Sequence, residues 1–276
     1  MGAWIMAGVT FQEATRRKIL WTAVAAGAAF LALFATGMHF QVQDLATHEV
    51  PPLIGHQVQA AMIQVGFYAV DLLAVVMTIL TSVDTLSGEI SSGTIQAIAT
   101  KPISRWEVLM GKWMGFAGMI AIYVSAMIGG VSAIGYFIAG VRPHNTGIGA
   151  LLVFLECLLL LTVTLACGTT FSTLANGVIV LGLHGLAFIG GWIEQIGALT
   201  TSPRLVTLGI IASLIMPSES MWRRASFEMQ SSLTRSMQFS PFSNASAPSS
   251  AMVGYAALYL LIALTIALYS FQERDL

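Results

Sequence analysis

Six long apolar stretches, separated by short polar connections, constrain the fold of this sequence more than any other feature. A helix needs about 20 mainly apolar residues to cross a bilayer, because in lipid its backbone polar groups must be satisfied within the segment. We therefore expect an all-α membrane protein with a single transmembrane domain over residues 1–276. The predicted spans are residues 20–38, 60–83, 114–139, 148–171, 178–196 and 251–271.

The composition supports the same class of protein. Of the 276 residues, 56% are hydrophobic and 9% are charged, and the mean hydropathy is +0.80. A soluble domain carries about a quarter charged residues. The few Lys and Arg residues are scattered and form no basic face, so nothing in the sequence points to nucleic-acid binding.

Residues 3–18 are predicted to form an interfacial helix before the first span. Trp4, Ala7, Phe11 and Ala14 share one helical face in this segment, which suits a helix lying in the headgroup plane.

The positive-inside rule predicts the orientation. The basic cluster at residues 16–18 places the N-terminus in the cytoplasm, while residues 39–59 contain no Lys or Arg and are expected to face outward. By parity, residues 87–106 and the C-terminus are cytoplasmic.

The same parity puts residues 197–250 outside, as a helical and loop segment before the last span. Their arginines go against the positive-inside tendency. Residues 205–216 are apolar but too short to cross a bilayer alone, so we expect a re-entrant or surface helix there.

Residues 87–106 form a polar island between the second and third spans. Thr94 and its neighbours provide N-cap hydroxyls for a short helix, and Pro102 closes that helix. Ser104, with Glu107 three residues later, matches a capping box for the next helix. We expect a short transverse helix on the cytoplasmic face, of the kind that a mechanical coupling to a soluble motor requires.

Residues of this island resemble the signature of the ABC type-2 permease family, the membrane subunits of ATP-driven exporters and related machines. The resemblance is carried by Glu89, Gly93, Thr94, the run 101–105 and Lys112. A second stretch, residues 217–224, resembles the branch of that family associated with multicopper-enzyme maturation.

The resemblance implies a non-catalytic permease subunit that works with separate ATPase subunits. Two permease copies, or two similar subunits, would pair in a bacterial or archaeal cytoplasmic membrane, and each would seat its coupling helix in an ATPase subunit. The sequence has no GxxxxGK[ST] phosphate loop. We therefore expect no cofactor on this chain, with ATP and Mg²⁺ held by the partner.

The resemblance also assigns roles within the island. Glu89 and Arg105 would contact the ATPase or hold the loop, and Gly93, Thr94 and Pro102 would give the loop its shape. The alternative is that these are ordinary loop residues that cap helices. Ser104 belongs to the same coupling set.

Asp71, Glu156 and His184 are ionisable residues that fall inside predicted spans. Such groups are costly in a bilayer and face protein or water. They would either line a pathway or relay protons, or bond to neighbours between packed helices. The second reading is favoured, because no Lys or Arg lies in a predicted span core to form a pair.

Other functions were weighed against an ABC exporter. An ion-coupled secondary transporter could use Asp71 and Glu156, but internal repeats are not found. An intramembrane hydrolase would need a motif such as HExxH, which is absent from the sequence. An ABC machine that transmits force to an extracytoplasmic partner without transport stays open, and so does the identity of any substrate.

Two smaller patterns complete the predictions. His39, His48 and His56 lie in one loop, but their spacing fits no standard metal-ligand pattern, so we expect no metal site. Gly111 and Gly115 have the GxxxG spacing that lets a neighbouring helix approach closely.

Overall fold

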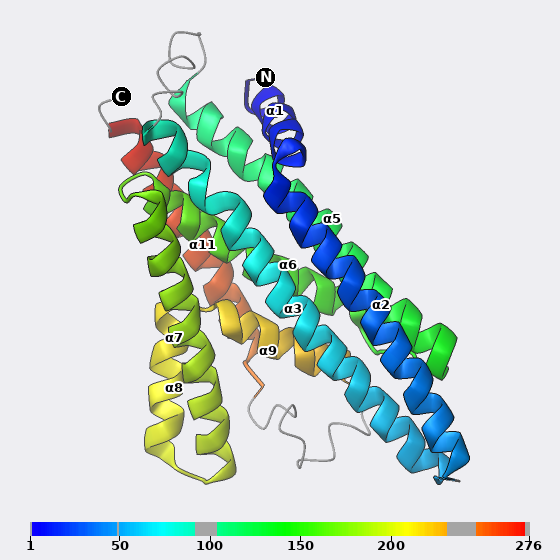
Figure 1. The fold of residues 1–276 in the computed structure, drawn as a ribbon. Helices are drawn as coiled ribbons and strands as arrows, with labels where there is room; N and C mark the ends of the chain where they lie inside the picture. The colour runs from blue at the N-terminus through cyan, green and yellow to red at the C-terminus, as the bar shows by residue number, and fades with distance from the viewer. Residues whose placement is uncertain (1, 49, 92–103, 231–246, 274–276) are drawn as a thin grey trace.

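The computed structural model describes residues 2–48, 50–91, 104–230 and 247–273, and these residues form helices joined by short turns (Figure 1). Six of the helices are long and apolar enough to span a membrane. They confirm all six spans predicted from the sequence. The spans are α2 (Lys18–Thr47), α3 (Pro52–Ser91), α5 (Arg105–Ala139), α6 (Thr146–Gly168), α7 (Thr173–Leu199) and α11 (Ser250–Glu273).

Several spans are longer than the bilayer requires. Helix α3 has 40 residues, which corresponds to a length of about 60 Å. The hydrocarbon core is about 30 Å thick. The ends of α3 therefore extend beyond the apolar part of the membrane, and its C-terminal end carries the polar residues of the island.

The long helices α2, α3 and α5 lie side by side, while α7 forms a hairpin with α8 (Pro203–Ile215) (Figure 1). Helix α6 contacts α3, α5, α7, α9 (Ser218–Met229) and α11, so it is the central helix of the bundle. Its residues Leu159, Leu160 and Leu165 are fully buried. A helix that is apolar on all sides is expected to take such a central position.

One end of the bundle gathers the segments that the sequence analysis placed on the cytoplasmic side. Helix α1, the end of α3, the start of α5 and the end of α11 all lie there, and the α2–α3 and α7–α8 turns lie at the opposite end (Figure 1). This arrangement agrees with an even number of spans.

Helix α1 (Gly2–Arg16) packs directly against the start of α5. The two helices approach at Gly111 and Gly115, because a Cβ atom at either position would overlap α1. At Gly115 that atom would lie 2.9 Å from the Ala7 carbonyl oxygen. The GxxxG prediction is therefore confirmed, and α1 is the helix that approaches.

Helix α1 covers the α5 glycines with Met6, Ala7, Thr10 and Ala14, which are its buried residues. Trp4 is 74% exposed. The membrane-facing role of the Trp4, Ala7, Phe11 and Ala14 face stays a prediction.

Between α7 and the last span the chain forms two short helices, α8 (Pro203–Ile215) and α9 (Ser218–Met229). Helix α8 returns along α7, and α9 then departs from it at an angle of 109°. The predicted short helix over residues 205–216 corresponds to α8. This bent pair is typical of a broken span or a re-entrant segment.

Helix α9 crosses the bundle instead of lying on its surface (Figure 1). It contacts α3, α6, α7 and α11, and Met221, Trp222 and Ala225 are almost completely buried. The sequence analysis did not predict this position. A polar segment of 12 residues resembles a surface helix until its long-range partners are known.

Candidate functional site

The predicted coupling residues lie at the α3–α5 connection. Gly93, Thr94 and Pro102 fall outside the described residues. Glu89, Ser104 and Arg105 are described, and they flank the connection on either side.

Glu89, in the last turn of α3, forms an ion pair with Lys112 of α5. The Lys112 Nζ atom donates a hydrogen bond of 2.5 Å to Glu89 Oε1. The Lys112 side chain is 2% exposed and that of Glu89 is 11% exposed. Little solvent screens such a pair, and removing one partner would leave a buried charge uncompensated. The pair therefore fastens the end of α3 to α5.

Ser104 begins α5 with the predicted capping box. Its hydroxyl group donates to Glu107 Oε2 at 2.8 Å, and its backbone N–H donates to the same oxygen at 3.3 Å. The other carboxylate oxygen of Glu107 accepts the backbone N–H of Gly2 at 3.2 Å. One carboxylate thus joins the starts of α5 and α1.

Arg105 connects the start of α5 to the last span. Its Nη1 atom donates to the carbonyl oxygen of Gln272, in the last turn of α11, at 3.0 Å. Nothing in the sequence indicates this contact. Residues 105 and 272 are far apart in the chain. The acceptor is a backbone carbonyl group, which every residue has, so the type of side chain at position 272 does not reveal the contact.

A further set of contacts links α3 to α2 and α7 at the same end. Asp84 accepts a hydrogen bond of 3.1 Å from the Thr173 hydroxyl group, and it lies 3.8 Å from an Arg17 guanidinium nitrogen. Ser87 and Thr173 hydroxyl groups lie 2.9 Å apart. The two boundaries of the α3–α5 connection are therefore bonded to several other helices of the bundle.

A second polar group lies inside the bundle, around Asp71 of α3 and Glu156 of α6. Asp71 is 7% exposed and Glu156 is fully buried. Asp71 Oδ1 and both carboxyl oxygens of Glu156 are buried and have no hydrogen-bond partner among the described residues. A buried carboxyl group without a partner is costly in the interior of a membrane protein. Glu219 of α9 is the next carboxyl group to this pair.

Helix α9 supplies most of the remaining bonds in this interior. Arg223 donates to Glu194 of α7 at 2.7 Å, and both side chains are buried. Ser218 lies 3.0 Å from His184 Nδ1, which gives this predicted site residue its partner.

Arg223 was not among the predicted site residues, because parity of the spans places the whole segment 197–250 outside. The signal that could have found it is the set of small residues in 218–226, namely Ser218, Ser220, Ala225 and Ser226, because small residues let a membrane helix pack closely among others. Arg223 thus lies in the interior of the bundle, where no Lys or Arg was expected from the sequence.

Within the described residues, no cluster of three or more His, Cys, Asp and Glu side chains could hold a metal ion. Cys157 and Cys167 are free. The interior group includes the Arg223–Glu194 ion pair and the His184–Ser218 contact, and both of these join α9 to α7. Its evident effect is to hold α9 in the bundle, while a role in a pathway stays a prediction.

Comparison with known proteins gives the family. The sequence model of the family described as ABC-2 family transporter proteins matches residues 4–276. No curated protein matches the chain. The match is to the family in general, so the multicopper-enzyme branch stays a prediction. With six membrane-spanning helices and a match over nearly its whole length, the chain belongs to the ABC-2 family of transporter membrane proteins.

Proposed function

We propose that this chain is the permease subunit of an ATP-driven exporter, and that it couples ATP hydrolysis by separate ATPase subunits to movement of a substrate across or out of the membrane. Family membership supports a permease that associates with an ABC ATPase. The observation that carries the coupling role is the anchoring of both ends of the α3–α5 connection to the bundle.

Because both of its ends are bonded to other helices, the α3–α5 connection can transmit a displacement to the membrane spans. The Glu89–Lys112 ion pair holds α3 to α5, and the Arg105 contact holds α5 to α11. A displacement of the connection by an ATPase would therefore move at least three spans together. In this mechanism Glu89 and Arg105 hold the connection, while Gly93, Thr94 and Pro102 shape the part that docks.

Exchanging the two charges of the Glu89–Lys112 pair tests whether this pair transmits movement from the α3–α5 connection to the spans. Glu89→Lys or Lys112→Glu alone places two like charges in a buried site, so we expect the permease to lose thermal stability and its effect on ATP hydrolysis. The double exchange restores the attraction and both properties. The measurements are the melting temperature and ATP hydrolysis by the reconstituted permease–ATPase complex.

Docking itself needs a separate measurement. Thr94→Trp is expected to weaken ATPase binding at least tenfold in a pull-down with the purified full-length chain, and Ile54→Trp, near the α2–α3 turn, should leave binding unchanged. Equal binding by both variants would reject docking at the α3–α5 connection. ATP hydrolysis that responds to the permease without any accompanying flux in liposomes would favour force transmission over export.

A further inference from the structure

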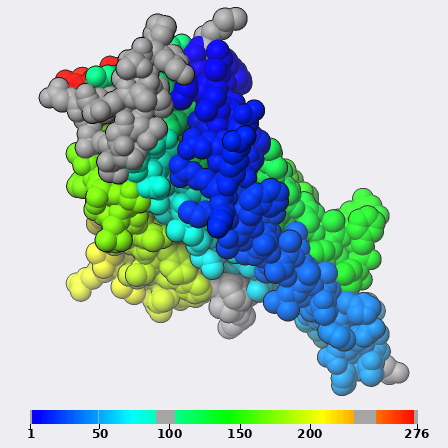
Figure 2. Space-filling model, turned by 45° about the horizontal axis from the view of Figure 1, so that its top comes forward, coloured from blue at the N-terminus to red at the C-terminus, as the bar shows by residue number. Residues whose placement is uncertain are grey.

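Helix α2 buries three residues against the rest of the bundle: Gly27, Phe34 and Met38. Gly27 leaves no room for a side chain, because a Cβ atom there would lie 2.9 Å from the Met127 sulfur and 3.0 Å from the Tyr123 hydroxyl oxygen. The same region of α2 forms part of an exposed face of the molecule (Figure 2). Between Leu20 and Leu31, every α2 residue other than Gly27 is partly or fully exposed.

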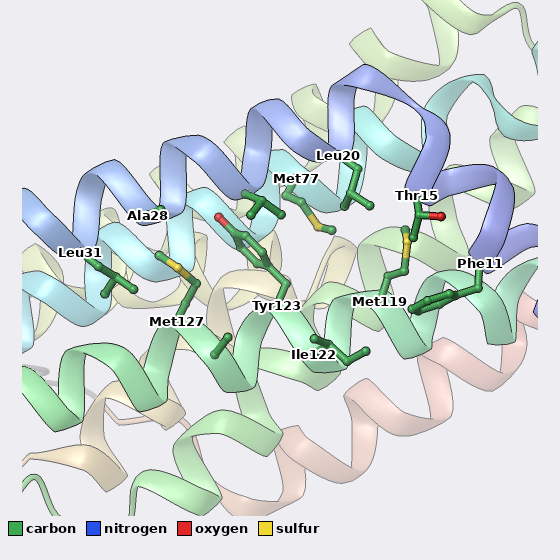
Figure 3. A pocket seen from close by; sticks show the side chains of 12 residues that line it. Phe11, Thr15, Leu20, Ala28, Leu31, Met77, Met119, Ile122, Tyr123 and Met127 are labelled. Carbon is green, nitrogen blue, oxygen red and sulfur yellow. The ribbon is translucent and has the colours of Figure 1, made fainter.

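Two grooves flank this contact. The first, of about 330 Å³, lies between α1, α2 and α5 and includes Leu20, Ala28 and Leu31 of α2 (Figure 3). The second, of about 320 Å³, lies between α2 and α3 and has Lys18 at one end. Tyr123 and Met77 line both grooves, and the Tyr123 hydroxyl group reaches α2, where it donates to the Ala23 carbonyl oxygen at 3.4 Å.

The grooves are lined mainly by hydrocarbon side chains, to which Thr22 and Tyr123 add hydroxyl groups, and their charged lining residue is Lys18. Thr15 lies at the α1 end of the first groove and Lys18 at that of the second. Lys18 is exposed, and within the described residues no carboxylate forms an ion pair with it. A molecule with an anionic head and a hydrocarbon tail matches this distribution.

The length of the first groove matches one leaflet. From Leu20 to Leu31, α2 rises about 16 Å at 1.5 Å per residue. Half of the hydrocarbon core measures about 15 Å. A hydrocarbon chain whose head lies level with Thr15 and Lys18 would therefore run along the groove to the middle of the bilayer.

We propose that the α2 grooves bind acyl chains of an anionic phospholipid from the leaflet next to α1, with the Lys18 ammonium group pairing with the lipid phosphate. A bound lipid fills space beside a helix that otherwise contacts its neighbours loosely. This site does not depend on the proposed coupling to an ATPase.

Four alanines around Gly27 offer matched variants. Ala28 lines the first groove and Ala26 lines the second, whereas Ala25 and Ala29 are exposed and line neither. Ala28→Phe and Ala26→Phe place a ring in a groove. Ala25→Phe and Ala29→Phe add the same ring to the outer surface of the same helical turn.

The test is native mass spectrometry of the purified full-length chain titrated with phosphatidylglycerol or phosphatidylcholine. We expect the wild type, Ala25→Phe and Ala29→Phe to retain tightly bound phosphatidylglycerol, and Ala26→Phe and Ala28→Phe to lose it. Lys18→Gln should reduce phosphatidylglycerol binding about fivefold, equivalent to about 1 kcal/mol for one basic residue at a membrane surface, and leave phosphatidylcholine binding unchanged.

Two results would overturn the proposal. Equal lipid retention by the groove variants and the outer-surface variants would mean that only non-specific annular lipid is bound. A loss of dimer mass in Ala26→Phe and Ala28→Phe, at constant lipid content, would instead assign the grooves to contact with a second copy of the chain.

Discussion

Two adjacent arginines of α9 have different environments. Arg223 is 1% exposed in its pair with Glu194, and Arg224 is 26% exposed in its pair with Glu228, one turn along the same helix. An ion pair that solvent reaches contributes little to stability. Loss of one partner from a buried pair leaves the other charge buried without a counterion, which is strongly destabilising. Burial, rather than the presence of a partner, therefore decides how much each arginine matters.

This contrast gives a matched prediction. Arg223→Gln should destabilise the protein by about 3–5 kcal/mol, because Glu194 is left buried without its cation. Arg224→Gln should cost about 1 kcal/mol or less. Thermal unfolding in detergent measures both. Similar shifts in melting temperature for the two variants would show that α9 is not buried as the structure places it.

Among the elements, α1 and α5 form the closest helix pair near the island. At Gly111 and Gly115, α5 has no side chain at its interface with α1, so the two backbones approach each other directly. Gly118 lies on the same helix, but a Cβ atom there would meet nothing within 4 Å. Helix α5 thus carries both tightly packed and open glycines.

Substitution of these glycines separates packing from helix propensity. Gly111→Ala should destabilise the protein by about 1–3 kcal/mol through overpacking against Met6 and the α1 backbone. Gly118→Ala should be neutral or stabilising by up to about 1 kcal/mol, because alanine favours the helix. The melting temperatures of the two variants provide the comparison. If Gly111→Ala melted no lower than Gly118→Ala, α1 would not pack on α5 through this interface.

The local features of the fold were predictable from the sequence, and the long-range ones were not. Span positions depend on about 20 consecutive residues, and the Ser104–Glu107 capping box depends on four, so both can be read from neighbouring letters. The position of α9 depends on Glu194 and on other helices that the sequence does not connect to it. The contact between Arg105 and Gln272 was not predictable for the same reason, because its partners are distant in the chain. The roles of Asp71 and Glu156 stay predictions.

For the whole molecule, the orientation in the membrane is a prediction that cysteine labelling can check. With Cys157 and Cys167 replaced by serine, Ile98→Cys should react with a membrane-impermeant maleimide from the cytoplasmic side, and Ile54→Cys from the opposite side. This expectation rests on the basic cluster before α2 and on the even number of spans. Labelling of both cysteines from one side, or labelling of position 98 from outside, would contradict it.

Gly2 and Gln272 both bond to the first turn of α5, one through Glu107 and the other through Arg105. The first helix, α1, and the last, α11, are therefore both bonded to side chains in the first turn of α5. A pair of fluorescent dyes attached near these two points would act as a spectroscopic ruler, and a change in energy transfer between them would reveal motion of α5 although neither dye sits on it.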